Sequence, residues 1–260
     1  MTHTFAISAY GDSPYLESCM KSLKGQSVQS DIILCTSTPS EYISSLAEKY
    51  DIPVYVRKGE PGIGYDWNFA YEKAPGQLVT IAHQDDIYQH DYVKTLFEAK
   101  EKYHDMSVFM TSSVTIKDGK LIEHGTVELV KKMLRVPLRL TFLNHIPAIK
   151  AAAISFGNPV ICPSCTYDRE LCGEAPFNTK YKFVLDWDAL SRLAVKNGRW
   201  VCVERPLIMY RVHADAATGE AIRNNVREEE ESEMFDRFLD EPFADIIKKA
   251  YKKSYDAYKN

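Results

Sequence analysis

The chain has 260 residues, of which 45% are hydrophobic and 26% are charged, and its formal net charge is −4. These values are typical of a globular protein with a sizeable core, built as one large domain or two small ones. The acidic balance excludes a general nucleic-acid footprint, although local basic patches remain compatible with it. The first residues lack the pattern of a signal peptide, and no window approaches the roughly 18 apolar residues of a membrane-spanning helix. We therefore expect a cytoplasmic protein, either free or at the inner face of the membrane.

The first half of the chain alternates short apolar strands with amphipathic helices. A strand over 4–9 leads through the turn "YGDSP" into a helix that contains Pro14 in its first turn, with Asp12 or Ser13 as the predicted cap. The later elements of this half are strands at 31–35, 53–57 and 76–82, and helices at 39–50 and after the glycine-containing loop 59–64. This order predicts βαβ units and a mostly parallel sheet flanked by helices.

A polar turn follows three of these strands. The turns are "AYGD" after the first strand, "CTST" after the second and "HQDD" after the fourth. Ligands of parallel sheets bind beyond the carboxyl ends of the strands. We therefore expect the three turns to line one edge and to form the functional site there.

The second half is less regular. It contains a predicted helix at 91–103, a strand at 107–116, a turn at 117–120, a helix at 183–198 and one or two strands over 199–218. The segment "VKKMLRVPLRLTFL" (130–143) combines basic and apolar residues around Pro137. Its alternatives are an ordinary amphipathic segment, a mobile flap, an acceptor-facing helix or a contact with a membrane surface.

From Glu220 onward the chain becomes a charged helical extension with an apolar stripe. The stripe consists of Phe235, Phe238, Leu239, Phe243, Ile246, Ile247 and Tyr251. Packing on the same chain or on a partner subunit is the first interpretation, and attachment to a membrane is the alternative.

Two clusters carry metal-ligating residue types. "CPSC" (162–165) with Cys172 resembles half of a zinc site, but no fourth ligand stands at close spacing, which favours buried cysteines. Asp85 and Asp86 offer hard oxygen ligands, which suit Mg²⁺ or Mn²⁺ when a diphosphate completes the shell. The alternative for the aspartate pair is a loop that caps the following helix.

The order of these parts resembles family 2 glycosyltransferases of the GT-A fold. The quoted segments are "SAYGDSPYLESCMKSLKGQS", "GIGYDWNFAYEKAPGQLVTIAHQDDIYQHDYV", "LDWDALSRLA" and "YRVHADAAT". They correspond to the opening strand and helix, the loop, helix and DXD segment, the acidic motif with the catalytic base, and the closing Tyr-Arg-x-His phrase. The resemblance extends over about 4–218.

The resemblance implies roles for individual residues. Asp186 would be the catalytic base, and its alternative is an acid that only stabilises a helix N-terminus. The implied metal ligands are Asp85, Asp86 and His213, and Trp187 is the implied contact with the acceptor. The implied donor and nucleotide contacts are Ala9, Tyr10, Thr36, Ser37, Asn68, His83, Gln84 and Arg211.

The sequence departs from the family pattern at three places. His83 replaces the first Asp of the DXD motif, and it would either ligate the metal or indicate altered metal use. Thr36, Ser37 and Thr38 stand where the family often has an acidic pair near the base, and Trp67 replaces the Arg of an Arg-Asn phrase. The nucleotide base therefore stays open.

We expect an inverting glycosyltransferase that uses a divalent metal, a nucleoside diphosphate sugar (UDP-sugar by resemblance) and a glycan or lipid-linked acceptor, in polysaccharide or glycolipid assembly. The expected domains are a GT-A domain over 1–218, with a donor half to about 116 and an acceptor half from about 117, and a helical extension over 219–260. That extension is also the candidate for homo-oligomer formation. The alternatives are a nucleotidyltransferase and a catalytically silent sugar- or nucleotide-binding module.

Overall fold

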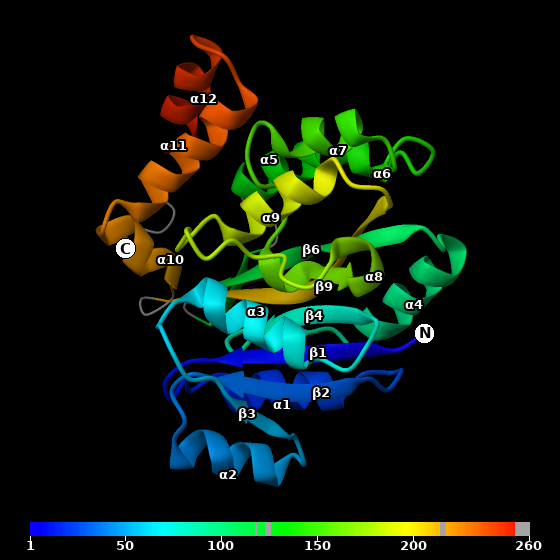
Figure 1. The fold of residues 1–260 in the computed structure, drawn as a ribbon, viewed down its shortest axis with the longest axis vertical. Helices are drawn as coiled ribbons and strands as arrows, with labels where there is room; N and C mark the ends of the chain where they lie inside the picture. Colours follow the sequence, from blue (N-terminus) through cyan, green and yellow to red (C-terminus); the bar gives the residue numbers. More distant parts are fainter. Residues whose placement is uncertain (118, 123–125, 214–216, 253–260) are drawn as a thin grey trace.

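The computed structural model describes residues 1–117, 119–122, 126–213 and 217–252, and within them a nine-stranded sheet runs through the molecule (Figure 1). The strands are β1 (His3–Ala9), β2 (Asp31–Thr36), β3 (Val54–Val56), β4 (Leu78–His83), β5 (Ile87–Tyr88), β6 (Met106–Lys117), β7 (Lys120–Ile122), β8 (Cys165–Asp168) and β9 (Arg199–Val212). The helices that pack on the sheet or precede it are α1 (Leu16–Lys24), α2 (Glu41–Lys49), α3 (Ile63–Lys73), α4 (Tyr92–Lys102), α5 (Thr126–Leu134), α6 (Val136–Arg139), α7 (Pro147–Ile154), α8 (Arg169–Cys172) and α9 (Leu185–Ala194). The C-terminal helices are α10 (Ala217–Arg223), α11 (Val226–Phe238) and α12 (Phe243–Lys252).

The order of the strands in the sheet is β3-β2-β1-β4-β8-β6-β9-β5, with β7 paired to β6. The first four strands are parallel, as the alternating pattern predicts. β8 is antiparallel to both of its neighbours, β4 and β6, whereas β6 and β9 are parallel. The α/β fold with a central sheet flanked by helices is therefore confirmed, and its sheet is mixed beyond β4.

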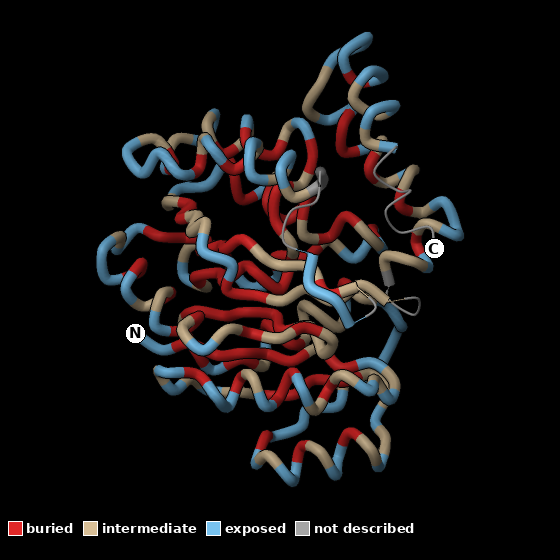
Figure 2. Tube along the Cα trace, turned by 180° about the vertical axis from the view of Figure 1, so that it is seen from behind, coloured by how far each residue is buried: buried red, intermediate tan, exposed pale blue. Residues whose placement is uncertain are grey.

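Apolar side chains of the strands alternate between two cores. Phe5 and Ile7 join a core with α1, α2 and α4, whereas Ala6 and Ile81 join the other core with α3, α7, α9 and α11. The alternation follows from the twofold repeat of side chains along a strand. Figure 2 shows the buried residues concentrated in the strands and in the helix faces that cover them.

The expected helix cap after β1 is not formed. α1 begins at Leu16, and no side chain caps it. Ser13 instead directs its hydroxyl to Asp85, 72 residues further along the chain. The residue that sequence reasoning assigned to a local cap is therefore used by the site.

The segment 130–143 forms α5 and α6, which meet at Arg135. The predicted turn at 117–120 includes residue 118, which lies outside the described residues, as do 123–125. Cys162, Cys165 and Cys172 are buried and free, which supports the interpretation of "CPSC" as core residues.

The C-terminal helices pack on the domain through the predicted stripe. Phe235 lies 5.1 Å from Trp187 by ring centroids, and Phe238 and Tyr251 pack against the same core. Phe243 and Ile246 of the same stripe are exposed. The described residues contain no helix with the length and apolar character that crossing a membrane requires. Residues 253–260 of the expected extension and 214–216 of "YRVHADAAT" lie outside the described part of the chain.

Candidate active site at the carboxyl ends of β1 and β4

A cavity of about 1520 Å³ opens beyond the carboxyl ends of β1 and β4. Its wall combines the turns after these strands with the end of β9, the start of α9 and parts of α5 and α12. A smaller hollow of about 440 Å³ adjoins it beside the end of β2, and Tyr10 and Pro61 line both. The site therefore lies at the edge that the sequence predicts.

Hydrogen bonds hold the three polar turns together. The backbone N–H of Tyr10 donates to Gln84 Oε1 at 3.1 Å, and Gln84 Nε2 donates back to the Tyr10 carbonyl at 2.9 Å. The backbone N–H of Gly11 donates to Thr38 Oγ1 at 2.7 Å. Gly11 adopts a φ of 62°, which favours glycine and lets the turn approach the second strand. Gln84 thus fixes the loop that carries Tyr10.

The end of β2 contributes one open residue and one enclosed residue. Ser37 lines the smaller hollow, whereas Thr36 is buried and its Oγ1 accepts from the backbone N–H of Thr38 at 3.0 Å. Ala9 is buried at the end of β1. The side chains of Thr36 and Ala9 therefore shape the turns from beneath, and a contact of Thr36 with a ligand stays a prediction.

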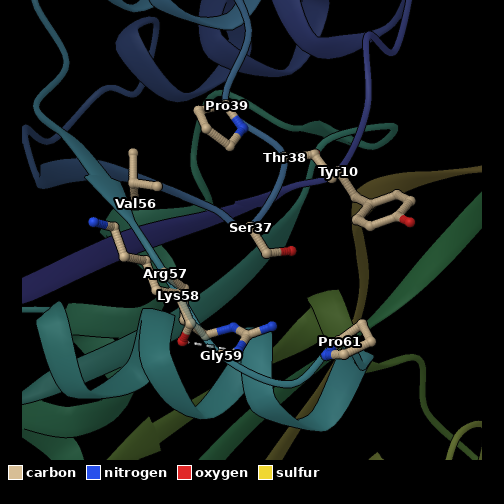
Figure 3. Close-up of a pocket in the computed structure, with 9 residues that line it drawn as sticks. All are labelled: Tyr10, Ser37, Thr38, Pro39, Val56, Arg57, Lys58, Gly59 and Pro61. Atoms are coloured by element: carbon tan, nitrogen blue, oxygen red, sulfur yellow. Dashed lines mark hydrogen bonds between the residues drawn. The ribbon is translucent and has the colours of Figure 1, made fainter.

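An ion pair joins Arg57, which lines the smaller hollow, to Asp66, which lines the larger cavity. Arg57 Nε donates to Asp66 Oδ1 at 2.6 Å, and Ser37 Oγ donates to Asp66 Oδ2 at 3.1 Å. Arg57 Nη2 is buried and has no hydrogen-bond partner among the described residues. Figure 3 shows Arg57 and Val56 facing Tyr10 and Pro61 across the hollow, with Ser37 between them. Tyr10 is 65% exposed, so its ring is available to a ligand there.

Asp85 and His213 meet at the centre of the larger cavity. Asp85 Oδ1 accepts from Ser13 Oγ at 2.6 Å, and Asp85 Oδ2 lies 3.2 Å from His213 Nε2. His213 Nε2 is buried and makes no hydrogen bond within the described residues. β9 delivers His213 to this position because its last residue is Val212.

Asp86, the next residue, lines the same cavity and makes a different contact. It is 1% exposed, and its Oδ1 accepts from the backbone N–H of Arg211 at 2.9 Å. Burial raises the pKa of Asp86 to about 8, and the Arg211 N–H opposes this rise only in part. Asp86 thus fastens the end of β9 to the turn after β4 through Oδ1, whereas its buried Oδ2 makes no hydrogen bond within the described residues, and its role at a metal stays a prediction.

Arg211 reaches the same turn with its side chain. Its Nε donates to the Asp85 carbonyl at 3.0 Å, and its guanidinium lies 4.2 Å from the centroid of the Tyr15 ring. Stacking on an aromatic face holds a guanidinium without neutralising its charge. Arg211 therefore brings a positive charge to the cavity wall beside Asp85 and His213.

His83 is packed flat against Trp67. The ring centroids are 5.0 Å apart with an interplanar angle of 29°. Burial lowers the pKa of His83 to about 4, so its imidazole is neutral, and its buried Nε2 makes no hydrogen bond within the described residues. Both residues line the cavity, so the replacement of Arg by Trp at 67 supplies the surface on which His83 rests.

Two protein groups converge in a way that suits a hard divalent ion. A carboxylate oxygen and an imidazole nitrogen 3.2 Å apart, at Asp85 and His213, are spaced as neighbouring ligands of Mn²⁺ or Mg²⁺ would be. Across the described residues, no cluster of three or more His, Cys, Asp or Glu could hold a metal by itself. The residues therefore fit an ion that takes its remaining ligands from a bound phosphate group or from water.

Asp186 stands in the first turn of α9, on the wall of the same cavity. Its Oδ1 accepts from the Trp187 backbone N–H at 2.8 Å, and its Oδ2 accepts from Asn158 Nδ2 at 2.9 Å. Burial raises the pKa of Asp186 to about 6, while these two donors oppose the rise. A carboxylate with a raised pKa at a cavity wall has the properties of a general base.

The two residues after Asp186 hold α9 in place. Trp187 is 2% exposed, and its Nε1 donates to the Ile154 carbonyl at 2.9 Å. Asp188 is buried and pairs with Arg192 and Arg237, each at 2.8 Å. Trp187 therefore has little free surface with which to contact an acceptor, and its principal role is packing beneath the cavity wall.

Asn68 is also structural. Its Nδ2 donates to the Phe177 carbonyl at 2.7 Å, and its Oδ1 accepts from the Phe177 backbone N–H at 3.0 Å. Both polar atoms of the amide are thus occupied, and Asn68 is absent from the described cavity lining. The amide ties α3 to the loop before α9, and a contact of Asn68 with the donor stays a prediction.

Sequence reasoning missed several residues of the site, namely Ser13, Tyr15, Arg57, Asp66 and Asn158. Arg57 directly follows the third strand, which is a signal that could have included it among the turns at the edge. Asn158 and Asp186 are 28 residues apart in an irregular region, so no local pattern indicates their contact.

Comparison with solved structures shows the same fold at low sequence identity. The model aligns with S. aureus TarS 1-349 in complex with UDP-GlcNAc at a TM-score of 0.64 and 14% identity, covering 99% of this chain and 73% of that one. It aligns with the mannosyltransferase PcManGT from Pyrobaculum calidifontis, in complex with GDP-Man and Mn²⁺, at a TM-score of 0.64 and 15% identity, covering 96% and 69%. For glucosyl-3-phosphoglycerate synthase from Mycobacterium tuberculosis, with Mn²⁺ and UDP-glucose, the values are 0.53 and 13%, covering 92% and 80%.

Sequence comparison gives the family. No curated protein matches the chain. The family model described as Glycosyl transferase family 2 matches residues 4–170, which is more than half of the chain and includes β1 to β4 and the turn with Asp85. The chain therefore belongs to glycosyl transferase family 2.

Proposed function

We propose that this chain transfers a sugar from a nucleoside diphosphate sugar to an acceptor hydroxyl, with inversion at the anomeric carbon and with a divalent metal. One observation carries the proposal. A single cavity gathers the Asp85–His213 pair, the positive charge of Arg211 and the carboxylate of Asp186 from three separate elements. These are the groups needed to bind a diphosphate and to deprotonate a hydroxyl.

The smaller hollow is the proposed site of the nucleotide base. The exposed Tyr10 ring offers a stacking surface, and stacking of one base on an aromatic ring contributes about 1–3 kcal/mol. Arg57, held by Asp66, lines the hollow, and its positive charge suits a carbonyl oxygen or ring nitrogen of the base. Ser37 adds a hydroxyl in place of the acid that family members often carry. Because the hollow shares Tyr10 and Pro61 with the larger cavity, a nucleotide could extend from one into the other.

The diphosphate is proposed to lie beside Arg211, Asp85 and His213. Arg211 is suited to phosphate oxygens because its guanidinium offers several donors and stays charged. Asp85 and His213 would hold Mn²⁺ or Mg²⁺, with Asp86 supporting them through the Arg211 backbone. When bound, the metal would offset the negative charge that develops on the departing diphosphate. The neighbours PcManGT and glucosyl-3-phosphoglycerate synthase, crystallised with Mn²⁺, support this assignment.

Asp186 is the proposed general base. It would take the proton from the acceptor hydroxyl as that oxygen attacks the anomeric carbon and as the bond between this carbon and the diphosphate oxygen breaks. The products would be the glycosylated acceptor, a nucleoside diphosphate and a protonated Asp186. With one base and one displacement, attack opposite the leaving group gives inversion. The raised pKa of Asp186 also favours catalysis over a silent binding module.

We further propose the division of labour expected from the sequence. Residues to about 116 would hold the donor, and the region from about 117, which includes α5 and α9, would hold a glycan or lipid-linked acceptor. Asp186 at the start of α9 would then lie where the two parts meet. A role in polysaccharide or glycolipid assembly would follow from such an acceptor.

A panel of nucleotide sugars tests the proposal, with Mn²⁺, Mg²⁺ or EDTA and with sugar transfer or donor hydrolysis as the readout. Asp186→Asn should abolish turnover and keep donor affinity, whereas Asp85→Ala should weaken metal-dependent donor binding. Asp245→Asn, on the exposed face of α12, is the control and should change neither. For inversion, the anomeric coupling of the product measured by NMR should be opposite to that of the donor. Full turnover by Asp186→Asn would refute the assignment of the base.

A further inference from the structure

α5 and α6 expose a continuous apolar stripe. Leu129 and Met133 lie one turn apart on α5, Val136 begins α6 and Leu140 directly follows α6, and all four are exposed. Leu129 is 59% and Met133 is 57% exposed, and Phe142, just beyond α6, is 69% exposed. More than half of each of these large apolar side chains is exposed to water. A cluster of exposed apolar side chains indicates a surface that binds a partner.

Basic residues surround the stripe. Residues 126–146 contain Lys131, Lys132, Arg135 and Arg139 against the single acid Glu128, which gives +4 − 1 = +3 in a chain of net charge −4. Arg135 is buried and paired with Glu128 at 2.7 Å and with Glu204 at 2.9 Å, so the cations that remain at the surface are Lys131, Lys132 and Arg139. Lys132 and Arg139 are exposed, next to Met133 and Leu140. The apolar stripe is thus flanked by surface cations.

We propose that the stripe of α5 and α6, with Phe142, docks on the anionic surface of a lipid bilayer. An amphipathic helix with large apolar side chains and flanking Lys or Arg lies in the plane of the interface, with its apolar face among the acyl chains and its cations at the headgroups. A second copy of the chain is the competing occupant. It would bring the same cations face to face across a twofold interface, so charge favours the anionic surface.

The apolar stripe lies next to the large cavity. Val130, Lys131 and Leu134 of α5 line the large cavity, on the helix face next to the stripe. In Figure 1, α5, α6 and α7 lie in the upper part of the molecule, as do α11 and α12, and far from α2 and β3. A bilayer on the stripe would therefore lie beside one wall of the cavity and leave the nucleotide hollow at the end of β2 facing water. The inference stands apart from the transfer reaction, because docking is measured without donor or acceptor.

Co-sedimentation of the full chain with vesicles tests the inference. One set of vesicles contains equal parts of phosphatidylglycerol and phosphatidylcholine, and the other contains phosphatidylcholine alone. The triple variant Leu129→Ser/Met133→Ser/Phe142→Ser and the charge variant Lys132→Glu/Arg139→Glu should each lower the partition coefficient on anionic vesicles by at least about tenfold. Val54→Ser on β3 and Lys94→Glu on α4 are the matched controls, and both should leave it unchanged. Circular dichroism and donor binding show that each variant is folded.

We expect sedimentation with anionic vesicles that weakens as salt rises, and little with phosphatidylcholine alone. Absence of sedimentation by folded protein that binds its donor would overturn the docking surface and leave the proposed function intact. Equal sedimentation with both kinds of vesicle, or by the charge variant, would refute the electrostatic part. A dimer in light scattering that the triple variant dissociates would identify the second copy as the occupant instead.

Discussion

Replacing Asp186 by Asn is expected to abolish transfer and, at neutral pH, to stabilise the protein. Burial moves the pKa of this carboxyl from 3.8 to about 6, which corresponds to about 3 kcal/mol of preference for the protonated form. Since the pKa is higher in the folded chain than in the unfolded one, ionisation opposes folding. The penalty is absent below pH 3.8, grows between that value and about 6, and stays constant above it.

An asparagine avoids this penalty but loses part of the hydrogen bonding. Its Oδ1 can still accept from the Trp187 N–H, whereas its amide group would face the Asn158 Nδ2 donor. Asn158 either loses an acceptor or turns over and gives up its bond from the Val160 N–H, at a cost of about 1 kcal/mol. Water in the cavity also reduces the original penalty, since Asp186 is only partly enclosed. We therefore expect a net gain of about 1–2 kcal/mol at neutral pH.

Urea unfolding followed by circular dichroism measures this gain at neutral pH and again at about pH 4, where it should disappear. Asp188→Asn is the matched control two residues away, on the same helix and with the same chemical change. It removes a buried partner of Arg192 and Arg237, so it should destabilise by about 3 kcal/mol. A loss of stability in Asp186→Asn at neutral pH, or an equal gain at both pH values, would refute the reasoning.

Four further outcomes follow from the site. The kcat/KM for transfer should fall about tenfold per pH unit below the pKa of Asp186, about 6, because the base must be ionised, and a profile flat through that pH would contradict the assignment. Asp85→Ala should lower donor affinity in Mn²⁺ at least about tenfold by calorimetry and leave the affinity in EDTA unchanged, whereas equal losses would argue against a metal ligand. Arg57→Ala should weaken binding of the nucleoside diphosphate about tenfold to hundredfold, with Lys58→Ala as the neighbouring control; equal affinity of the Arg57 variant would remove Arg57 from the base site. Asn68→Ala should cost about 1–3 kcal/mol of stability without changing donor affinity in the folded protein, and a selective loss of affinity would instead support the donor contact predicted from the sequence.

The N-terminal half of the fold was predictable from the sequence because its contacts are close to local. β1, β2 and β3 are consecutive in the chain and adjacent in the sheet, and β4 joins β1 on the other side. Each strand has an apolar run that stops at a polar turn, so periodicity indicates both the strand and the edge at which it ends. The meeting of Tyr10, Thr38 and Gln84 at that edge follows from parallel pairing alone.

The second half was harder to predict because long-range pairing determines it. β8 has four residues, Cys165–Asp168, and it is a strand because it fits between β4 and β6, which lie far from it in the sequence. A run that short carries no distinguishing period. Its antiparallel insertion makes the sheet mixed, and the sequence expectation of a mostly parallel sheet applies to β1–β4.

The sequence by itself indicated which edge of the sheet carries the polar turns. It also indicated the two aspartates of the turn after β4 and the acid at the start of α9. The tertiary structure decided which of these side chains meet. Asp85 lies beside His213, whereas the adjacent Asp86 turns to the Arg211 backbone, and Asp186 faces the cavity while Asp188 pairs with two arginines in the interior. Each pair of neighbouring aspartates has the same chemistry, and the contacts of each side chain depend on other elements of the fold. For Asp85 and Asp86 these elements lie more than a hundred residues away in the sequence. Those contacts and the burial that comes with them set the pKa values of Asp86 and Asp186, on which the proposed chemistry depends.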